Sequence, residues 1–173
     1  RALALARQSM PTLRGIVVGD GPERGVLESL ASQLGLSGAV TFAGSQPDVF
    51  QLLGSATMLV LCSDDEGLPN VLLEAMAARV PVVTTPAGDA SHVVEDGVTG
   101  YVVGHDDLDT LADRMVRLAR SPSLREELTN AAHRFVSDQH SLPVLARRVI
   151  AIYSSVAQMR DRQDLLRLLS QLA

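Results

Sequence analysis

Residues 57–85 read TMLVLCSDDEGLPNVLLEAMAARVPVVTT, and this stretch decides the fold class. Its two ends, residues 57–62 and 81–85, are short and almost entirely apolar, which is typical of parallel strands that are covered on both faces. Between them, residues 63–69 predict a loop, and the following residues up to Arg79 predict a helix. A strand, a loop, a helix and a second strand in this order form the repeating unit of an α/β fold.

The same alternation extends in both directions from this stretch. We predict strands at residues 13–18, 40–43, 57–62, 81–85 and 99–103. We predict helices at residues 1–10, 23–34, 48–53, 70–79, 91–94, 107–119, 122–138 and 142–159. Apolar residues in the 23–34 helix recur at helical spacing, so we expect one stripe of it to pack against a sheet. Short connections predict right-handed crossovers, and hence an α/β, Rossmann-like parallel sheet flanked by helices.

Composition excludes several classes of protein. The chain has 173 residues, of which 46% are hydrophobic and 20% are charged, as in an ordinary globular domain. A formal net charge of −5, without a dense basic stripe, argues against a nucleic-acid partner. Cys62 is the only cysteine, which rules out an internal disulfide and a cysteine-rich zinc site within this chain. No apolar run reaches the roughly 20 residues that span a bilayer, and we expect a soluble, cytoplasmic protein.

The domain organisation predicted from these patterns is one domain at residues 1–159 followed by a helical tail at 160–173. The chain starts at Arg1 inside a helical pattern and without an initiator Met, so we expect a fragment of a longer protein. The tail has a leucine stripe that could pack on another domain, on a second copy or on a membrane surface. We favour docking on protein. The stripe consists of Leu165, Leu166, Leu168, Leu169 and Leu172.

The loop and helix at residues 66–78 carry the most specific chemistry. Gly67 allows a ligand to approach the backbone, and the free N–H groups at Asn70 and Val71 favour an anion such as a pyrophosphate. Glu66, just before the helix, can accept hydrogen bonds from sugar hydroxyls. Glu74 is the sole charge in an otherwise apolar stretch of helix, so we expect it to be buried and to need a partner such as a pair of ligand hydroxyls.

Ordinary structural roles compete with these assignments. Glu66 can be an acid that stabilises a helix dipole, and Glu74 can be a core residue in a salt bridge. The Gly19-Asp20-Gly21 sequence is equally compatible with a turn and with a ligand contact. We expect Phe42 to pack in the core. A further group of single residues is assigned to surface or packing roles, namely His92, His105 and Cys62.

Five motifs in register resemble the group 1 retaining glycosyltransferases, whose GT-B fold pairs two Rossmann-like domains. The resemblance covers residues 1–156 and corresponds to the second, donor-binding domain of such enzymes. The motifs are Gly19-Asp20-Gly21-Pro22, Val40-Thr41-Phe42-Ala43-Gly44, the pair Glu66 and Glu74 with seven residues between them, Asp96-Gly97-Val98-Thr99-Gly100, and residues 106–112.

The resemblance implies a role for each matching residue. Glu74 would bind the ribose hydroxyls of a nucleotide diphosphate sugar, and Glu66 would position the donor sugar. The backbone at Gly67, Leu68, Pro69, Asn70 and Val71 would hold the distal phosphate. The Phe42, Ala43 and Gly44 turn, with the loop around Gly21, would flank the base. Such enzymes transfer a hexose with retention of anomeric configuration, typically without a bound metal or any other cofactor.

The chain also departs from the family pattern. Members usually have, upstream of the first helix, a strand and loop whose Arg and Lys neutralise the pyrophosphate, and an N-terminal acceptor domain that closes the cleft. Neither is in this sequence, so we expect the chain alone to bind donor without transferring it. Arg79 stands where a small residue is common, and Asp89 replaces the second Gly of a frequent pair, which puts a donor-sugar contact there in doubt.

Two other functions remain open at this point. A nucleotide-sugar epimerase can be built on the same two-domain fold, but it would need acid and base groups in the cleft, and no carboxylate and His pair here clearly supplies them. A non-catalytic nucleotide-sugar-binding module would be favoured if the upstream strand were absent from the natural gene. A phosphorylation receiver is discounted, because it requires paired acids after the first strand.

Overall fold

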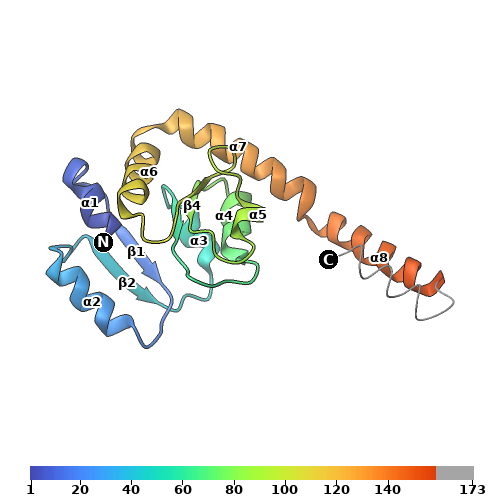
Figure 1. Cartoon of the computed structure of the whole chain (residues 1–173), viewed down its shortest axis with the longest axis horizontal. Helices are drawn as coiled ribbons and strands as arrows, with labels where there is room; N and C mark the ends of the chain where they lie inside the picture. Colours follow the sequence, from blue (N-terminus) through green and yellow to red (C-terminus); the bar gives the residue numbers. More distant parts are fainter. Residues whose placement is uncertain (159–173) are drawn as a thin grey trace. The chain divides into compact units, whose positions relative to one another are not determined.

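The structure, a computed structural model, describes residues 1–158 (Figure 1). The chain divides into two compact units, Arg1–Arg134 and the residues from 135 onward. The first unit contains all of the strands among the described residues. The predicted helical tail at 160–173 lies outside the described residues.

The predicted elements form in the predicted order. The strands are β1 (Gly15–Val18), β2 (Val40–Gly44), β3 (Leu59–Leu61), β4 (Val82–Thr84) and β5 (Tyr101–Val102). The helices are α1 (Ala2–Ser9), α2 (Arg24–Gln33), α3 (Val49–Leu53), α4 (Asn70–Ala77), α5 (Ala90–Val93), α6 (Leu108–Arg120), α7 (Pro122–Gln139) and α8 (Leu142–Gln158). Two helix starts follow directly from the sequence, because Asp48 and Asp107 cap α3 and α6 by accepting hydrogen bonds from backbone N–H groups.

The strands are parallel, as predicted, but they form two sheets in the described structure. One sheet has the order β1-β2 and the other β3-β4-β5. In the first, Gly15 is paired with Val40, and in the second Val60 is paired with Val83. Parallel strands end at a common edge of their sheet, so the loops that follow β3 and β4 meet at one edge and those that follow β1 and β2 at another.

The core of the first unit surrounds the second sheet. All three residues of β4 are buried, as expected for a strand covered on both faces. α1 and α6 pack against each other, and α4, α5 and α6 contact the strands or one another around β4 (Figure 1). Leu118 and Leu128 are fully buried in the same region. This packing fixes the positions of the loops that leave β3 and β4.

Two expectations about burial were wrong. No residue of α2 is fully buried: Val26 and Leu27 of its apolar stripe are exposed, and Leu30 and Ala31 are only half-buried, so the stripe is covered only in part. β3 is half-buried along its whole length and is not covered on both faces. In both cases the apolar pattern correctly predicted the element but not what covers it.

Arg79, which stands where a small residue is common in the family, follows the end of helix α4. Arg79 adopts φ +58°, the left-handed conformation that a glycine most easily takes after a helix. Its guanidinium donates a 2.6 Å hydrogen bond from Nη1 to Oδ1 of Asn130. The arginine is therefore accommodated at a position that favours glycine, and its side chain ties the end of α4 to α7.

Within the described residues, the second unit contains the last residues of α7, from Phe135 onward, and the whole of α8. The Phe135 and His140 rings lie 5.4 Å apart, and Arg148 Nη2 donates to Gln139 Oε1 at 2.7 Å. α8 exposes a row of large apolar side chains at Leu142, Leu145, Val149, Ile150, Ile152, Tyr153 and Val156. No helix within residues 1–158 is both long and apolar enough to cross a membrane.

Candidate functional site

The loop after β3 holds Glu66 in a defined position. Ser63 Oγ donates to Glu66 Oε1 at 2.7 Å, and the Glu66 side chain is half-buried. Thr85, which follows β4, donates from Oγ1 to the Ser63 carbonyl at 2.6 Å. The carboxylate is thus attached through one serine to two adjacent strands, and one of its oxygens keeps free acceptor capacity.

Gly88 allows the loop after β4 to pack directly on the backbone of Glu66 and Gly67. It adopts φ +52°, and a Cβ at this position would lie 2.7 Å from the Gly67 carbonyl oxygen and against the Glu66 carbonyl. The Asp89 N–H donates to the Gly67 oxygen at 3.1 Å. Only glycine meets both requirements, a left-handed backbone and the absence of a side chain.

The first turn of α4 presents free backbone donors beside this loop. The Leu72 N–H already donates to the Pro69 carbonyl at 3.0 Å, but Asn70 and Val71 have no backbone acceptor among the described residues. Pro69 precedes the helix without a side-chain cap. Free N–H groups and the positive end of a helix together favour an anion, so the predicted anion site at this place stays a prediction that the geometry allows.

The prediction that Glu74 is buried was wrong. Its side chain is exposed, whereas Leu72, Ala75 and Met76 of the same helix are buried. Glu74 lies one turn beyond Asn70 on the exposed face of α4, since residues four apart share a helix face. The argument from desolvation therefore fails, but the carboxylate is accessible to a ligand that reaches along α4 from its first turn.

The predicted base-flanking residues are brought together at the end of the first sheet. The Gly19 N–H donates to the Gly44 carbonyl at 2.8 Å, which joins the loop around Gly21 to Phe42, Ala43 and Gly44; these three residues were expected to form a turn but are the last residues of β2. Phe42 is half-buried. Among the described residues, no hydrogen bond links this group to the one around Glu66, so the structure shows two separate groups of predicted site residues.

Arg24 lies against the same end of β2 and was not predicted as a site residue. Its Nη2 donates to the Phe42 carbonyl at 3.3 Å, and its charge is compensated by Glu28 at 2.9 Å and by Asp20 at 3.7 Å. The sequence signal was available, since a cation two residues after Gly-Pro at a strand end is well placed to face a ligand. The supporting roles of Ser63, Thr85 and Gly88 had no such signal.

The loops at the end of the second sheet are acidic. Asp64 and Asp65 are exposed next to Glu66, and Asp64 lies 3.7 Å from Nδ1 of His105. His92 is largely exposed, as expected, and its Nδ1 lies 3.3 Å from Oδ1 of Asp89. Within residues 1–158, no three His, Cys, Asp or Glu side chains converge as a metal site would require. The negative charge of these loops repels an anion bound at the start of α4. Binding therefore requires that the positive helix end and cations from outside this loop group outweigh that repulsion.

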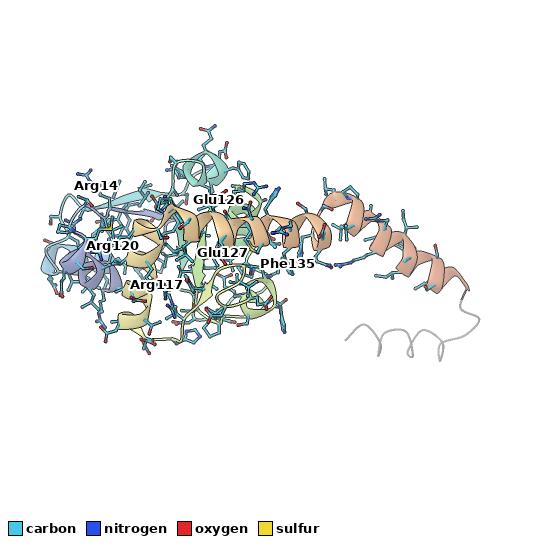
Figure 2. All side chains as sticks on the ribbon, turned by 90° about the horizontal axis from the view of Figure 1, so that it is seen from above. Arg14, Arg117, Arg120, Glu126, Glu127 and Phe135 are labelled. Atoms are coloured by element: carbon cyan, nitrogen blue, oxygen red, sulfur yellow. The ribbon has the colours of Figure 1, made fainter. Side chains whose placement is uncertain are left out.

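Two shallow hollows lie away from these loops. One, of about 480 Å³, is bounded by α6 and the start of α7 and includes Arg117 and Arg120, which Figure 2 labels. The other, of about 420 Å³, is lined by residues that precede β1 and β2, including Arg14 and Ser37. Because ligands of open α/β sheets bind beyond the carboxyl ends of strands, we assign the site to the loops and not to these hollows.

Cys62, which follows β3, was predicted to be a small core residue, but it is exposed. Burial around the sulfur nevertheless raises the pKa of the Cys62 thiol, and the α-amino charge of Arg1 opposes that shift in part. The thiolate is the reactive form, so its fraction at pH 8 is reduced.

We therefore expect Cys62 to react with iodoacetamide at pH 8 at least about twofold more slowly than a cysteine in an unstructured peptide. Mass spectrometry of the folded chain measures the rate, and the same chain in concentrated urea is the control. A folded rate equal to or above the unfolded rate would show that the surroundings do not suppress the thiolate.

The family model described as "Glycosyl transferases group 1" matches residues 1–135. The chain is 32% identical over 149 residues to the N-acetyl-alpha-D-glucosaminyl L-malate synthase of Bacillus anthracis, which covers 86% of this chain and 39% of that protein. It is 33% identical over 139 residues to the lipopolysaccharide core biosynthesis glycosyltransferase LpsE of Rhizobium meliloti, covering 80% of this chain and 41% of that protein. The chain thus spans less than half of the length of these relatives.

Solved structures share the fold. Anabaena Alr3699/HepE, crystallised in complex with UDP and glucose, superimposes with a TM-score of 0.80 at 27% identity, over 89% of this chain and 43% of that one. The Staphylococcus aureus TarM G117R mutant also gives a TM-score of 0.80, at 20% identity, over 89% of this chain and 31% of that one. These neighbours are GT-B glycosyltransferases, and the α/β fold with parallel sheets predicted from the sequence is confirmed.

Proposed function

Because the chain belongs to the group 1 family of glycosyl transferases, we propose that it binds the nucleotide diphosphate sugar that donates a hexose in a retaining transfer reaction. The observation that carries the proposal is the first turn of α4, whose N–H groups at Asn70 and Val71 have no backbone acceptor among the described residues and lie in sequence between two carboxylates, the fixed Glu66 and the accessible Glu74. Two phosphates, a sugar and a ribose require this combination of donors and acceptors.

Each group in the site has one task in this proposal. The backbone at Gly67, Leu68, Pro69, Asn70 and Val71 holds the distal phosphate, because free N–H groups at a helix start attract an anion. This contact orients the sugar toward Glu66. Ser63 keeps the Glu66 carboxylate from rotating, so that the carboxylate accepts hydrogen bonds from sugar hydroxyls in one orientation.

The nucleoside lies along the exposed face of α4 in this arrangement. Glu74 follows Asn70 by one helical turn and accepts hydrogen bonds from the two ribose hydroxyls. The base is flanked by Gly21 and by Phe42, Ala43 and Gly44 at the end of β2. That Alr3699/HepE was crystallised with UDP and glucose supports a nucleotide sugar as the ligand class for this chain.

Transfer to an acceptor is assigned to the parent protein and not to these residues alone. The chain spans 39% and 41% of two glycosyltransferase relatives, and we propose that an N-terminal domain of the parent protein binds the acceptor. The residues at α4 bind and orient the donor and form no covalent bond to it. We further propose that the donor binds without a metal or another cofactor, and that the protein works in the cytoplasm, as a single unpaired cysteine favours.

The Glu74→Ala variant of the parent protein is expected to bind its nucleotide diphosphate sugar at least about tenfold more weakly, because hydrogen bonds to a charged group contribute about 1.5–3 kcal/mol. Calorimetric titration with a panel of nucleoside diphosphates and their sugars measures the effect and identifies the base. Glu66→Ala is expected to weaken binding of the sugar form but to leave that of the free diphosphate almost unchanged.

Glu95→Ala is the matched control, because Glu95 is an exposed carboxylate that precedes the amino end of β5. The candidate site lies at the carboxyl ends of the parallel strands of this sheet. Glu95→Ala changes the net charge by the same amount as Glu74→Ala. Equal affinities of the two variants for every member of the panel would contradict the assignment of Glu74 to the ribose. Equal loss of sugar and diphosphate binding in Glu66→Ala would contradict the assignment of Glu66 to the sugar.

A further inference from the structure

The hollow of about 420 Å³ at the amino ends of β1 and β2 is surrounded by hydrogen-bond donors. Two arginines, Arg7 and Arg14, line it together with Thr12 and Ser37, and no Asp or Glu lines it. The backbone N–H groups of Thr12 and Ser37 have no backbone acceptor among the described residues. A hollow with several donors and without an acidic side chain favours an anion.

The two arginines of this hollow carry charges that no carboxylate neutralises. Arg7 is half-buried, and its guanidinium donates to the Leu13 carbonyl, which fixes the side chain beside the hollow but leaves its charge uncompensated. Arg14 is exposed. Neither arginine forms an ion pair within residues 1–158. Two like charges that line one hollow repel each other, and a bound anion removes that repulsion.

A structural role explains one of these arginines but not the other. Arg7 lies in the last turn of α1, where a cation stabilises the negative end of the helix dipole. Arg14 lies in the segment between α1 and β1, so it has no helix end to stabilise. Its charge is therefore available to a ligand.

The end of α6 adds positive charge next to the hollow. Arg120 Nη2 donates to the Ser9 carbonyl at 2.7 Å, which places the end of α6 beside the end of α1. In Figure 2, Arg14, Arg117 and Arg120 lie at the same end of the first unit. Arg117 and Arg120 also form no ion pair in the part of the chain that the structure describes. Because the net charge is −5, this group of arginines is a local exception that attracts anions to this end.

The charges and donors of the hollow fit a phosphate better than a carboxylate. A guanidinium presents a planar fork of donors that matches two oxygens of a phosphate. A phosphate monoester carries close to two negative charges at pH 7 and has three strong acceptor oxygens. A carboxylate carries one charge, so it would leave one of the two arginines uncompensated.

We propose that this hollow binds the phosphate monoester group of a further ligand through the guanidinium groups of Arg7 and Arg14 and the N–H groups of Thr12 and Ser37. A volume of about 420 Å³ accommodates the phosphate and part of the group that carries it. The hollow lies at the amino ends of β1 and β2, whereas the proposed donor site lies at the carboxyl ends of the strands. The inference goes beyond donor binding and does not depend on it.

Titration of the isotopically labelled 173-residue chain with inorganic phosphate, followed through the amide NMR signals, tests the proposal. The Thr12 and Ser37 signals are expected to shift and to saturate with a Kd of about 1 mM or lower. Arg14→Gln should raise this Kd at least about tenfold, because it removes hydrogen bonds to a charged group. Arg147→Gln is the matched control, since it removes another exposed arginine, in α8, and should change the Kd by less than about twofold.

Two further probes distinguish the sources of the phosphate. Glycerol 3-phosphate that binds more tightly than inorganic phosphate, and that loses affinity in Arg14→Gln, would identify a small phosphomonoester as the ligand. Sedimentation of the chain with phosphatidylcholine vesicles that contain phosphatidic acid, but not with vesicles of phosphatidylcholine alone, would identify a lipid headgroup. Arg14→Gln should then no longer sediment with the vesicles.

Equal Kd values of Arg14→Gln and the unmodified chain for phosphate would overturn the proposal. So would shifts of Thr12 and Ser37 that sodium chloride reproduces at the same ionic strength, because the arginines would then respond only to salt. Acetate that binds as tightly as phosphate would contradict the choice of a doubly charged ligand. Shifts confined to the start of α4 would place the phosphate at the proposed donor site alone and would overturn the inference as well.

Discussion

Replacing Gly88 by alanine is expected to lower the free energy of unfolding by about 3 kcal/mol and to weaken donor binding at least about tenfold. Gly88 has φ +52°, and the added Cβ would lie 2.7 Å from the Gly67 oxygen, so the loop that carries Glu66 must move. A left-handed alanine adds about 1–2 kcal/mol of strain. Urea unfolding measures the stability, and titration of the parent protein with its nucleotide diphosphate sugar measures the binding.

Gly97→Ala is the control that separates the effect of backbone strain from the effect of the clash between the two loops. Gly97 has φ +74°, but a Cβ there meets no atom within 4 Å. This variant should lose only about 1–2 kcal/mol of stability and should bind the donor as the unmodified protein does. If Gly88→Ala and Gly97→Ala were equally stable and bound the donor equally well, the contact between the two loops would have no role in positioning Glu66.

Replacing Gly100 by alanine is expected to lower the free energy of unfolding by about 2–3 kcal/mol through overpacking of the core. Its Cβ would lie 2.5 Å from Cγ2 of Val82 and 2.8 Å from Cγ1 of Val94, and both valines are almost completely buried. Backbone strain does not contribute, because the φ of Gly100 is not positive. Urea unfolding of the 173-residue chain measures the effect.

Gly104→Ala is the control for this second substitution, since the nearest atom to its Cβ is that of Asp107 at 4.0 Å. It should change stability by less than about 0.5 kcal/mol. Adding Val94→Ala to Gly100→Ala removes one of the two clashing methyl groups, so the double variant should lose less than the sum of the single losses. Strict additivity would contradict the predicted contact with Val94.

Local patterns predicted the elements well because each element depends on residues close in sequence. α4 begins after Pro69 and ends just before Arg79, and β4 is the buried strand that an apolar run flanked by Pro81 and Thr85 indicates. The caps Asp48 and Asp107 could be expected for the same reason, since a cap acts on N–H groups two or three residues away.

Burial was predicted less well because it depends on what lies opposite each face. Glu74 stands in an almost wholly apolar stretch but faces outward, and Val26 and Leu27 of α2 are exposed in spite of their helical spacing. An apolar pattern indicates which face of an element tends to be buried, but not which other element buries it. The division into two sheets has the same origin, since the pattern identifies strands but not their neighbours.

The sequence pointed to the groups that we propose to bind the ligand, but not to the residues that hold them in place. Glu66 and the N–H groups of Asn70 and Val71 could be found from one motif. Thr85, which holds the Ser63 carbonyl from 22 positions away, and Gly88, which holds the backbone of Glu66, act through contacts between loops. Such contacts follow from the packing of β3 beside β4 and have no local signature.

The central claim is that the diphosphate of the donor binds at the first turn of α4. The most direct measurement is a titration of the isotopically labelled parent protein with its tightest-binding nucleoside diphosphate, followed residue by residue through the amide NMR signals. We predict that the largest shifts are those of Gly67, Leu68, Asn70 and Val71. Largest shifts at Arg14 and Ser37, which line the hollow at the opposite ends of β1 and β2, would contradict the account.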